Sequence, residues 1–196
     1  MKKIILLILV FVCSFGIDLG AKCKFKKKVD SYSKSMAEYC NVTLDVCSRP
    51  VVLFSKYRTS ASIAMAKGGE NKYFVLFYFT RTDSKKFELL KDNSLDLFLN
   101  NGEKIQLFPS GVFSGNYLGL SFNFIIKCLY QIDKQQLQKL AGNQVDMVSI
   151  HYTSEKELNG SQIDPEGKFS LDYEIASKTN KANAGNLAQC MLELNL

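Results

Sequence analysis

The sequence has little of what most catalytic and metal sites are built from. It contains one histidine, His151, among 196 residues, and its six cysteines include no Cys-x-x-Cys pair. A thioredoxin-like redox site and a structural zinc site both need ligand spacings that are missing here, so neither is expected. The serine-hydrolase pattern Gly-x-Ser-x-Gly is also missing, because residues 111–115 read Gly-Val-Phe-Ser-Gly. We therefore predict no catalytic, cofactor-binding or metal-binding residue.

Basic residues are abundant only near the start of the chain. Of 25 basic and 19 acidic side chains, seven basic and one acidic lie in residues 1–28, which leaves 18 of each in residues 29–196. The three arginines, Arg49, Arg58 and Arg81, are scattered, so no nucleic-acid partner is expected. A basic arm spans residues 22–28 and carries Lys22, Lys24, Lys26, Lys27 and Lys28. We interpret it either as a solvated, flexible segment or as an attachment point for an anionic membrane or glycan surface.

Long apolar runs are missing except for one at the N-terminus. Lys2 and Lys3 precede an apolar stretch over residues 4–17, and small residues then offer cleavage after Gly16 or Ala21. This order predicts a signal peptide over residues 1–21 and export to the periplasm, the outer surface or the medium. The run is short for a membrane span, which needs about 20 residues, so an integral membrane protein is not expected. An uncut anchor and a lipoprotein attached through Cys13 or Cys23 remain alternatives.

Prolines and linkers are scarce as well. The three prolines lie far apart, and no repeat or low-complexity tract interrupts the chain. Residues 29–196 are therefore expected to form a single globular domain. Its predicted fold class is α+β: an antiparallel β-sheet meander, one short helix over about residues 133–141 and a C-terminal helix over about residues 182–194. The expected strands cover residues 73–80, 95–99, 103–108, 117–130, 145–153 and 169–173.

Local patterns support these elements. Residues 73–80 are apolar at nearly every position, which predicts a central strand covered on both faces. Asn101-Gly102 between two alternating runs predicts a hairpin. For the short helix, Asp133 is expected to cap the start together with Gln136, and Gly142 to close the end. The C-terminal helix is expected to present Leu187, Met191 and Leu194 on one side, with Cys190 beside them.

Two segments in the middle third of the chain resemble known sequences. Residues 122–153 combine a strand, Tyr-x-Ile, a capped Leu-x-x-Leu helix and another strand, and residues 95–107 form the hairpin before it. This pattern resembles uncharacterised exported proteins of bacterial envelopes. The resemblance implies export and a non-catalytic, sheet-based domain, and it brings no catalytic residues. The cysteines and the basic arm are not part of it.

Five cysteines remain after signal removal, enough for up to two disulfides and one odd thiol. Cys40 and Cys47 are close in sequence and are predicted to form a disulfide. Cys128 and Cys190 are each expected to face the core, where they can pair or pack as small apolar side chains. This second pair is the weaker expectation.

The function expected from the sequence is a non-enzymatic binding or structural module of the cell envelope. Its expected partners are an envelope protein, a glycan or an anionic membrane surface. One alternative is a small hydrolase that uses a carboxylate pair or His151, which a cleft beside these groups would favour. The other is a carrier of a lipid-like or glycan ligand, which a closed apolar cavity would favour.

Overall fold

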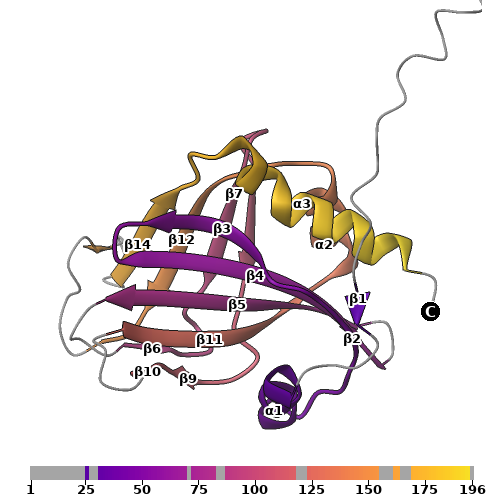
Figure 1. The fold of residues 1–196 in the computed structure, drawn as a ribbon, viewed down its shortest axis with the longest axis horizontal. Helices are drawn as coiled ribbons and strands as arrows, with labels where there is room; N and C mark the ends of the chain where they lie inside the picture. Colours follow the sequence, from indigo (N-terminus) through magenta and orange to yellow (C-terminus); the bar gives the residue numbers. More distant parts are fainter. Residues whose placement is uncertain are drawn as a thin grey trace, which may run out of the picture.

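The computed structural model describes residues 25–26, 31–69, 72–82, 87–117, 123–154, 161–163 and 169–194. The predicted signal peptide lies outside these residues, as do all lysines of the basic arm except Lys26. The described residues form antiparallel β-sheets and three helices, so the α+β expectation is confirmed at that level (Figure 1). The expected single meander is replaced by two separate larger sheets and a short two-stranded one.

The first sheet is built around one long apolar strand. Its strands are, in spatial order, β1 (Phe25–Lys26), β2 (Leu44–Ser48), β4 (Thr59–Gly68), β5 (Lys72–Thr82), β11 (Asn123–Ile132) and β10 (Asn116–Tyr117). The strand β3 (Val51–Lys56) follows β2 and also pairs with β4. Strand β5 pairs with β4 on one side and β11 on the other, and residues 74–77 are buried. The prediction of a central strand from its continuous apolar run is confirmed.

The second sheet contains the predicted hairpin. Its strands are, in spatial order, β13 (Gln162–Ile163), β14 (Phe169–Glu174), β12 (Val145–Tyr152), β7 (Leu95–Leu99) and β8 (Lys104–Leu107). The β7–β8 turn uses Gly102 at a positive φ of 84°, a conformation that costs glycine little. The short strands β6 (Glu88–Leu89) and β9 (Phe113–Ser114) form the two-stranded sheet.

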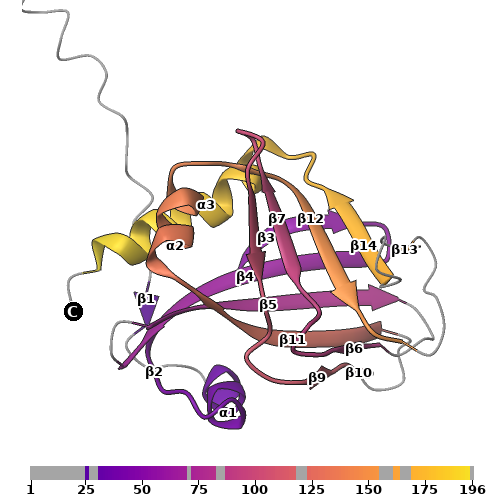
Figure 2. The same ribbon diagram turned by 180° about the vertical axis from the view of Figure 1, so that it is seen from behind.

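Aromatic side chains link the strands in the core. Strands of the second sheet cross those of the first at a steep angle (Figures 1 and 2). Phe87 lies 4.9 Å from Phe124 of the first sheet and 5.2 Å from Tyr152 of the second, measured between ring centroids. Phe54 of β3 stacks on Tyr173 of β14 at 4.4 Å. Each such pair contributes about 0.5–1.5 kcal/mol beyond its burial, so the phenylalanines and tyrosines stabilise the packing of sheet on sheet.

Helix α1 (Ser31–Tyr39) was not expected from the sequence. It packs near β11, and its residues Met36 and Ala37 are buried. Helix α2 (Lys134–Ala141) was expected, and its capping box is confirmed: the Asp133 carboxylate accepts from Gln136 N, and Asp133 N donates to the Gln136 side chain. Gly142 ends the helix with a φ of −85°, so it closes α2 without a left-handed turn.

Helix α3 (Lys178–Glu193) begins four residues before the expected start, with the Ser177 hydroxyl accepting from Asn180 N. Its buried positions are Ala184, Gly185, Ala188 and Met191. The expected stripe is confirmed, because Met191 is buried and Leu187 and Leu194 pack partly buried against the core. The small residues beside it, which pack closely on α2, were not expected. Asn183 on the same helix donates to the Val52 carbonyl of β3 at 2.7 Å.

The first residues that the structure describes belong to the first sheet. Phe25 and Lys26 form β1, which pairs antiparallel with Ser48 and Cys47 of β2. The interpretation of the basic arm as a flexible segment is therefore wrong for these two residues. Among the residues that the structure describes, no helix combines the length and the apolar character that a membrane crossing requires.

Candidate functional site

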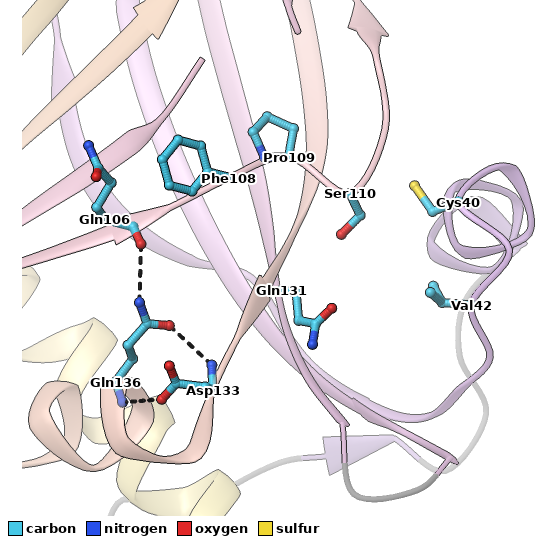
Figure 3. Close-up of a pocket in the computed structure, with 9 residues that line it drawn as sticks. All are labelled: Cys40, Val42, Gln106, Phe108, Pro109, Ser110, Gln131, Asp133 and Gln136. Carbon is cyan, nitrogen blue, oxygen red and sulfur yellow. Dashed lines mark hydrogen bonds between the residues drawn. The ribbon is translucent and has the colours of Figure 1, made fainter. Parts of the chain in front are cut away.

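An open groove of about 490 Å³ lies where α1, the segment after β8 and the start of α2 meet (Figure 3). Cys40 and Val42 line it from the end of α1, and Phe108, Pro109 and Ser110 from the segment after β8. These elements are brought together by strand pairing, because Pro109 bridges to Tyr130 of β11 and Ser110 N donates to the Leu129 carbonyl at 2.7 Å.

The wall formed by α2 is held rigidly by the capping box. The Gln136 side chain accepts from Asp133 N at 3.1 Å and donates to the Gln106 carbonyl at 3.1 Å. Figure 3 shows these bonds joining the start of α2 to β8. Both ends of the Gln136 amide are therefore occupied, and its role is to position the wall.

Other groups in the groove are available to a ligand. The Phe108 ring is 49% exposed, and Gln131 is exposed at the end of β11. The Gln131 amide and the Ser110 hydroxyl make no side-chain hydrogen bond to another described residue, and Figure 3 shows both directed toward the space between the walls. An aromatic face with an uncharged amide and a hydroxyl nearby can stack on and hydrogen-bond to a polar organic molecule.

The Cys40 thiol lines the same groove but is a poor nucleophile. Burial raises the pKa of Cys40, an effect that the positive charge of Lys91 partly offsets. A thiol reacts as its thiolate, and a raised pKa lowers the thiolate fraction at neutral pH. At the rim, Tyr39 packs on Phe113 at 5.8 Å and donates its hydroxyl to the Val112 carbonyl at 2.8 Å, which fixes the end of α1.

A second polar cluster surrounds His151 on the second sheet. Asp96 lies on the face of β7 opposite Leu95 and Leu97, and its side chain is 4% exposed. Lys104 donates to Asp96 Oδ2 at 2.9 Å, and His151 Nε2 lies 3.6 Å from the same oxygen. The other carboxylate oxygen, Oδ1, has no hydrogen-bond partner among the described residues.

The His151 cluster and the groove are different places. A histidine next to a buried carboxylate can accept and release a proton. His151 is not among the groove-lining residues, and Asp133 is the one charged residue that lines the groove in the part of the chain that the structure describes. A cleft beside His151 or beside two carboxylates would have favoured a hydrolase. The groove is not such a cleft.

The predicted Cys40–Cys47 disulfide is not formed, because both residues are thiols. Cys40 follows the end of α1, whereas Cys47 is buried on β2, an extended strand that begins at Leu44. A strand advances about 3.3 Å per residue, which carries Cys47 away from the helix end, and a disulfide needs Cα atoms within about 7 Å.

The weaker pair, Cys128 with Cys190, is not formed either. Cys128 is a buried thiol on β11, and burial raises its pKa well above the ordinary value. Cys190 of α3 takes part in a disulfide bond, so it is not paired with the free Cys128 thiol.

The sequence did not single out the groove residues or Asp96. A signal was present for Phe108: Ile105 and Leu107 point inward, so the alternation places Phe108 outward and its ring on the surface. No sequence pattern predicted that Asp96 would lie next to His151, because their contact depends on the pairing of β7 with β12. Among the described residues no cluster of three or more metal-ligand side chains suits a metal ion.

No protein-family model matches the sequence, and no curated protein or solved structure matches the chain. The resemblance to exported bacterial envelope proteins therefore stays a prediction.

Proposed function

We propose that the protein is an exported, non-enzymatic binding module of the cell envelope and that the groove beside Phe108 holds its ligand. The observation that carries this proposal is the set of available groups in the groove: a half-exposed ring, an amide and a hydroxyl. All three are uncharged, and the neighbouring thiol of Cys40 is held in its neutral form by burial.

The ligand class that fits these groups is a neutral glycan segment. A sugar presents an apolar ring face, which stacks on an aromatic side chain, and hydroxyls, which both donate to and accept from an amide. A lipid-like ligand is a poorer match, because polar side chains from Ser110, Gln131 and Asp133 interrupt the apolar wall.

The test is a titration of the ¹⁵N-labelled protein without its signal peptide against maltohexaose, cellohexaose and chitohexaose, followed by NMR. We expect at least one sugar to shift the amide signals of residues 106–110 and 131–136. The variants Phe108→Ala and Gln131→Ala should weaken binding at least tenfold. The matched controls are Tyr57→Ala and Gln162→Ala, which alter an exposed aromatic residue and an exposed glutamine on other elements.

Two outcomes would overturn the groove as the ligand site. One is that no sugar shifts these signals at millimolar concentration. The other is that Phe108→Ala binds as tightly as Tyr57→Ala while both keep the same melting temperature. Export is tested separately by intact mass: protein recovered outside the cytoplasm should begin at Ile17 or Lys22.

A second candidate function is a small hydrolase, favoured by the 3.6 Å approach of His151 to Asp96. In that proposal Asp96 orients the imidazole, and His151 acts as a general base. Lys104 competes for the same carboxylate oxygen at 2.9 Å, which weakens the orientation. Turnover of generic ester and glycoside substrates that is abolished by His151→Ala would support the hydrolase over the binding module.

A further inference from the structure

We infer that the turn between β3 and β4 docks the protein on an anionic lipid surface, where Tyr57 enters the interface and Lys56 and Arg58 bind lipid phosphates. The two strands meet at the pair Lys56 and Thr59, so the turn consists of Tyr57 and Arg58 alone. Tyr57 is 84% exposed. The inference is independent of the ligand proposed for the groove, because the turn and the groove share no residue.

Arg58 has an unfavourable backbone conformation. Its φ is 64°, in the left-handed region that glycine and asparagine adopt readily and arginine does not. In the described part of the chain, Asn41 is the one other non-glycine residue with a positive φ, and asparagine tolerates it. The turn is held in this form because Thr82 N donates to the Arg58 carbonyl at 2.8 Å. Glycine or asparagine would fit here with less strain, so stability alone does not explain an arginine at this position.

The side chains of the turn are available to a partner. Lys56, Tyr57 and Arg58 are all exposed, and the guanidinium carbon of Arg58 lies 4.8 Å from the centre of the Tyr57 ring. Neither Lys56 nor Arg58 forms an ion pair with another described residue. A guanidinium that stacks on an aromatic ring keeps its donors free, so Arg58 can still bind a phosphate oxygen.

The shape of the turn favours a lipid surface over other partners. Small-molecule sites are concave, whereas a two-residue turn between two strands is convex. A stable protein interface buries about 800 Å² on each partner, which is more than three side chains supply. A lipid surface requires neither a cavity nor so large an area. Tyrosine is favoured at the boundary between headgroups and acyl chains, and basic side chains attract anionic headgroups.

Docking through this turn orients the groove. Figures 1 and 2 both show the β3–β4 turn at one end of the molecule and α2 and β1 at the other. The groove lies against the start of α2, so it faces away from the lipid and stays open to solution. Attachment through β1, which carries Lys26, would present the opposite end of the molecule to the lipid.

The experiment uses tryptophan fluorescence of the protein without its signal peptide. The sequence contains no tryptophan, so Tyr57→Trp places a single reporter at the turn. Vesicles of phosphatidylcholine mixed with phosphatidylglycerol should shift its emission to shorter wavelength, and vesicles of phosphatidylcholine alone should not. Phe108→Trp is the matched control, because it places the reporter at an exposed aromatic position in the groove, where the emission should not change.

Two further substitutions measure the contribution of the charges. In the Tyr57→Trp protein, Arg58→Gly and Lys56→Gln should each weaken binding to the anionic vesicles about fivefold, the equivalent of about 1 kcal/mol. Arg49→Gln is the control, because it removes the same charge from an exposed arginine outside the turn and should leave the affinity unchanged. Arg58→Gly should also keep or raise the melting temperature, since it removes the strained conformation.

Sedimentation with the same vesicles separates docking by the turn from attachment by another part of the molecule. If the protein sediments while the Tyr57→Trp emission stays unshifted, another surface carries the attachment and the inference is wrong. It is also wrong if neither the wild type nor the Tyr57→Trp protein sediments with anionic vesicles. A shift with soluble polygalacturonate and none with vesicles would assign the turn to an anionic glycan and exclude the lipid surface.

Discussion

Replacing Gly185 with alanine tests whether the packing of α3 on α2 is as close as the structure indicates. A Cβ added at Gly185 would lie 2.4 Å from the Asn143 carbonyl oxygen and 3.0 Å from the Leu140 carbonyl oxygen. Both are backbone atoms, so neither can move away by a side-chain rotation. Alanine is intrinsically better than glycine inside a helix by about 1 kcal/mol, which opposes the steric cost.

The steric cost of the added methyl group should exceed the gain in helix propensity. Overpacking a well-filled interface costs about 1–3 kcal/mol, and a contact of 2.4 Å against backbone belongs at the upper end of that range. We therefore expect Gly185→Ala to lower the free energy of unfolding by about 1–2 kcal/mol, the difference between the cost and the helix gain. Urea denaturation followed by circular dichroism at 222 nm measures this, with an unchanged m-value expected.

Gly142→Ala is the matched control. Its added Cβ would meet nothing closer than 3.8 Å, and its φ of −85° suits any residue. Its free energy of unfolding should change by less than about 0.5 kcal/mol. If Gly185→Ala is as stable as wild type or more stable, the close approach of the two helices is wrong and propensity alone governs this position.

Three other substitutions or treatments have defined outcomes. Tyr130→Phe should leave thermal stability unchanged or raise it, because the fully buried hydroxyl has the Cys128 thiol beside it but no stronger hydrogen-bond partner. A melting temperature lower by more than about 5 °C would contradict this. His151→Ala should stay folded and keep any activity later found, because Lys104 still neutralises Asp96; a large loss of turnover at an unchanged melting temperature would be the contrary result. Burial raises the pKa of both Cys40 and Cys128, so a thiol reagent at pH 8 should modify partly exposed Cys40 slowly and Cys128 only after unfolding. Equal modification rates of the two thiols in the native protein would refute the burial of Cys128.

The elements that the sequence predicted correctly are those whose signal is local. The Asn101-Gly102 hairpin is recognised from two residues that tolerate positive φ between alternating runs. The capping box at Asp133 is recognised from a spacing of three residues. Strand β5 is recognised because both of its faces are covered, which requires an apolar residue at nearly every position.

The elements that were missed depend on distant partners. Helix α1 has three serines among its nine residues, so helix propensity marks it only weakly, and its stability comes from packing near β11. The contribution of Ala184, Gly185 and Ala188 to the buried side of α3 was missed, because small residues give no apolar signal until α2 lies against them. The groove unites three segments that are up to 96 residues apart, from Cys40 to Gln136, and strand pairing brings them together.

The edges of the two larger sheets bear on how the protein behaves at high concentration. Strands β1, β10 and β13 are two residues long and β8 is four, so these edges offer little template for another chain. The six-residue strand β3 is a longer edge, and α3 covers it, with Asn183 occupying the Val52 carbonyl. An uncovered edge of that length is a site for intermolecular strand addition. By covering β3, the C-terminal helix should prevent intermolecular strand addition at this edge. A chain truncated before Ser177 should therefore form β-rich aggregates even where its sheets still fold.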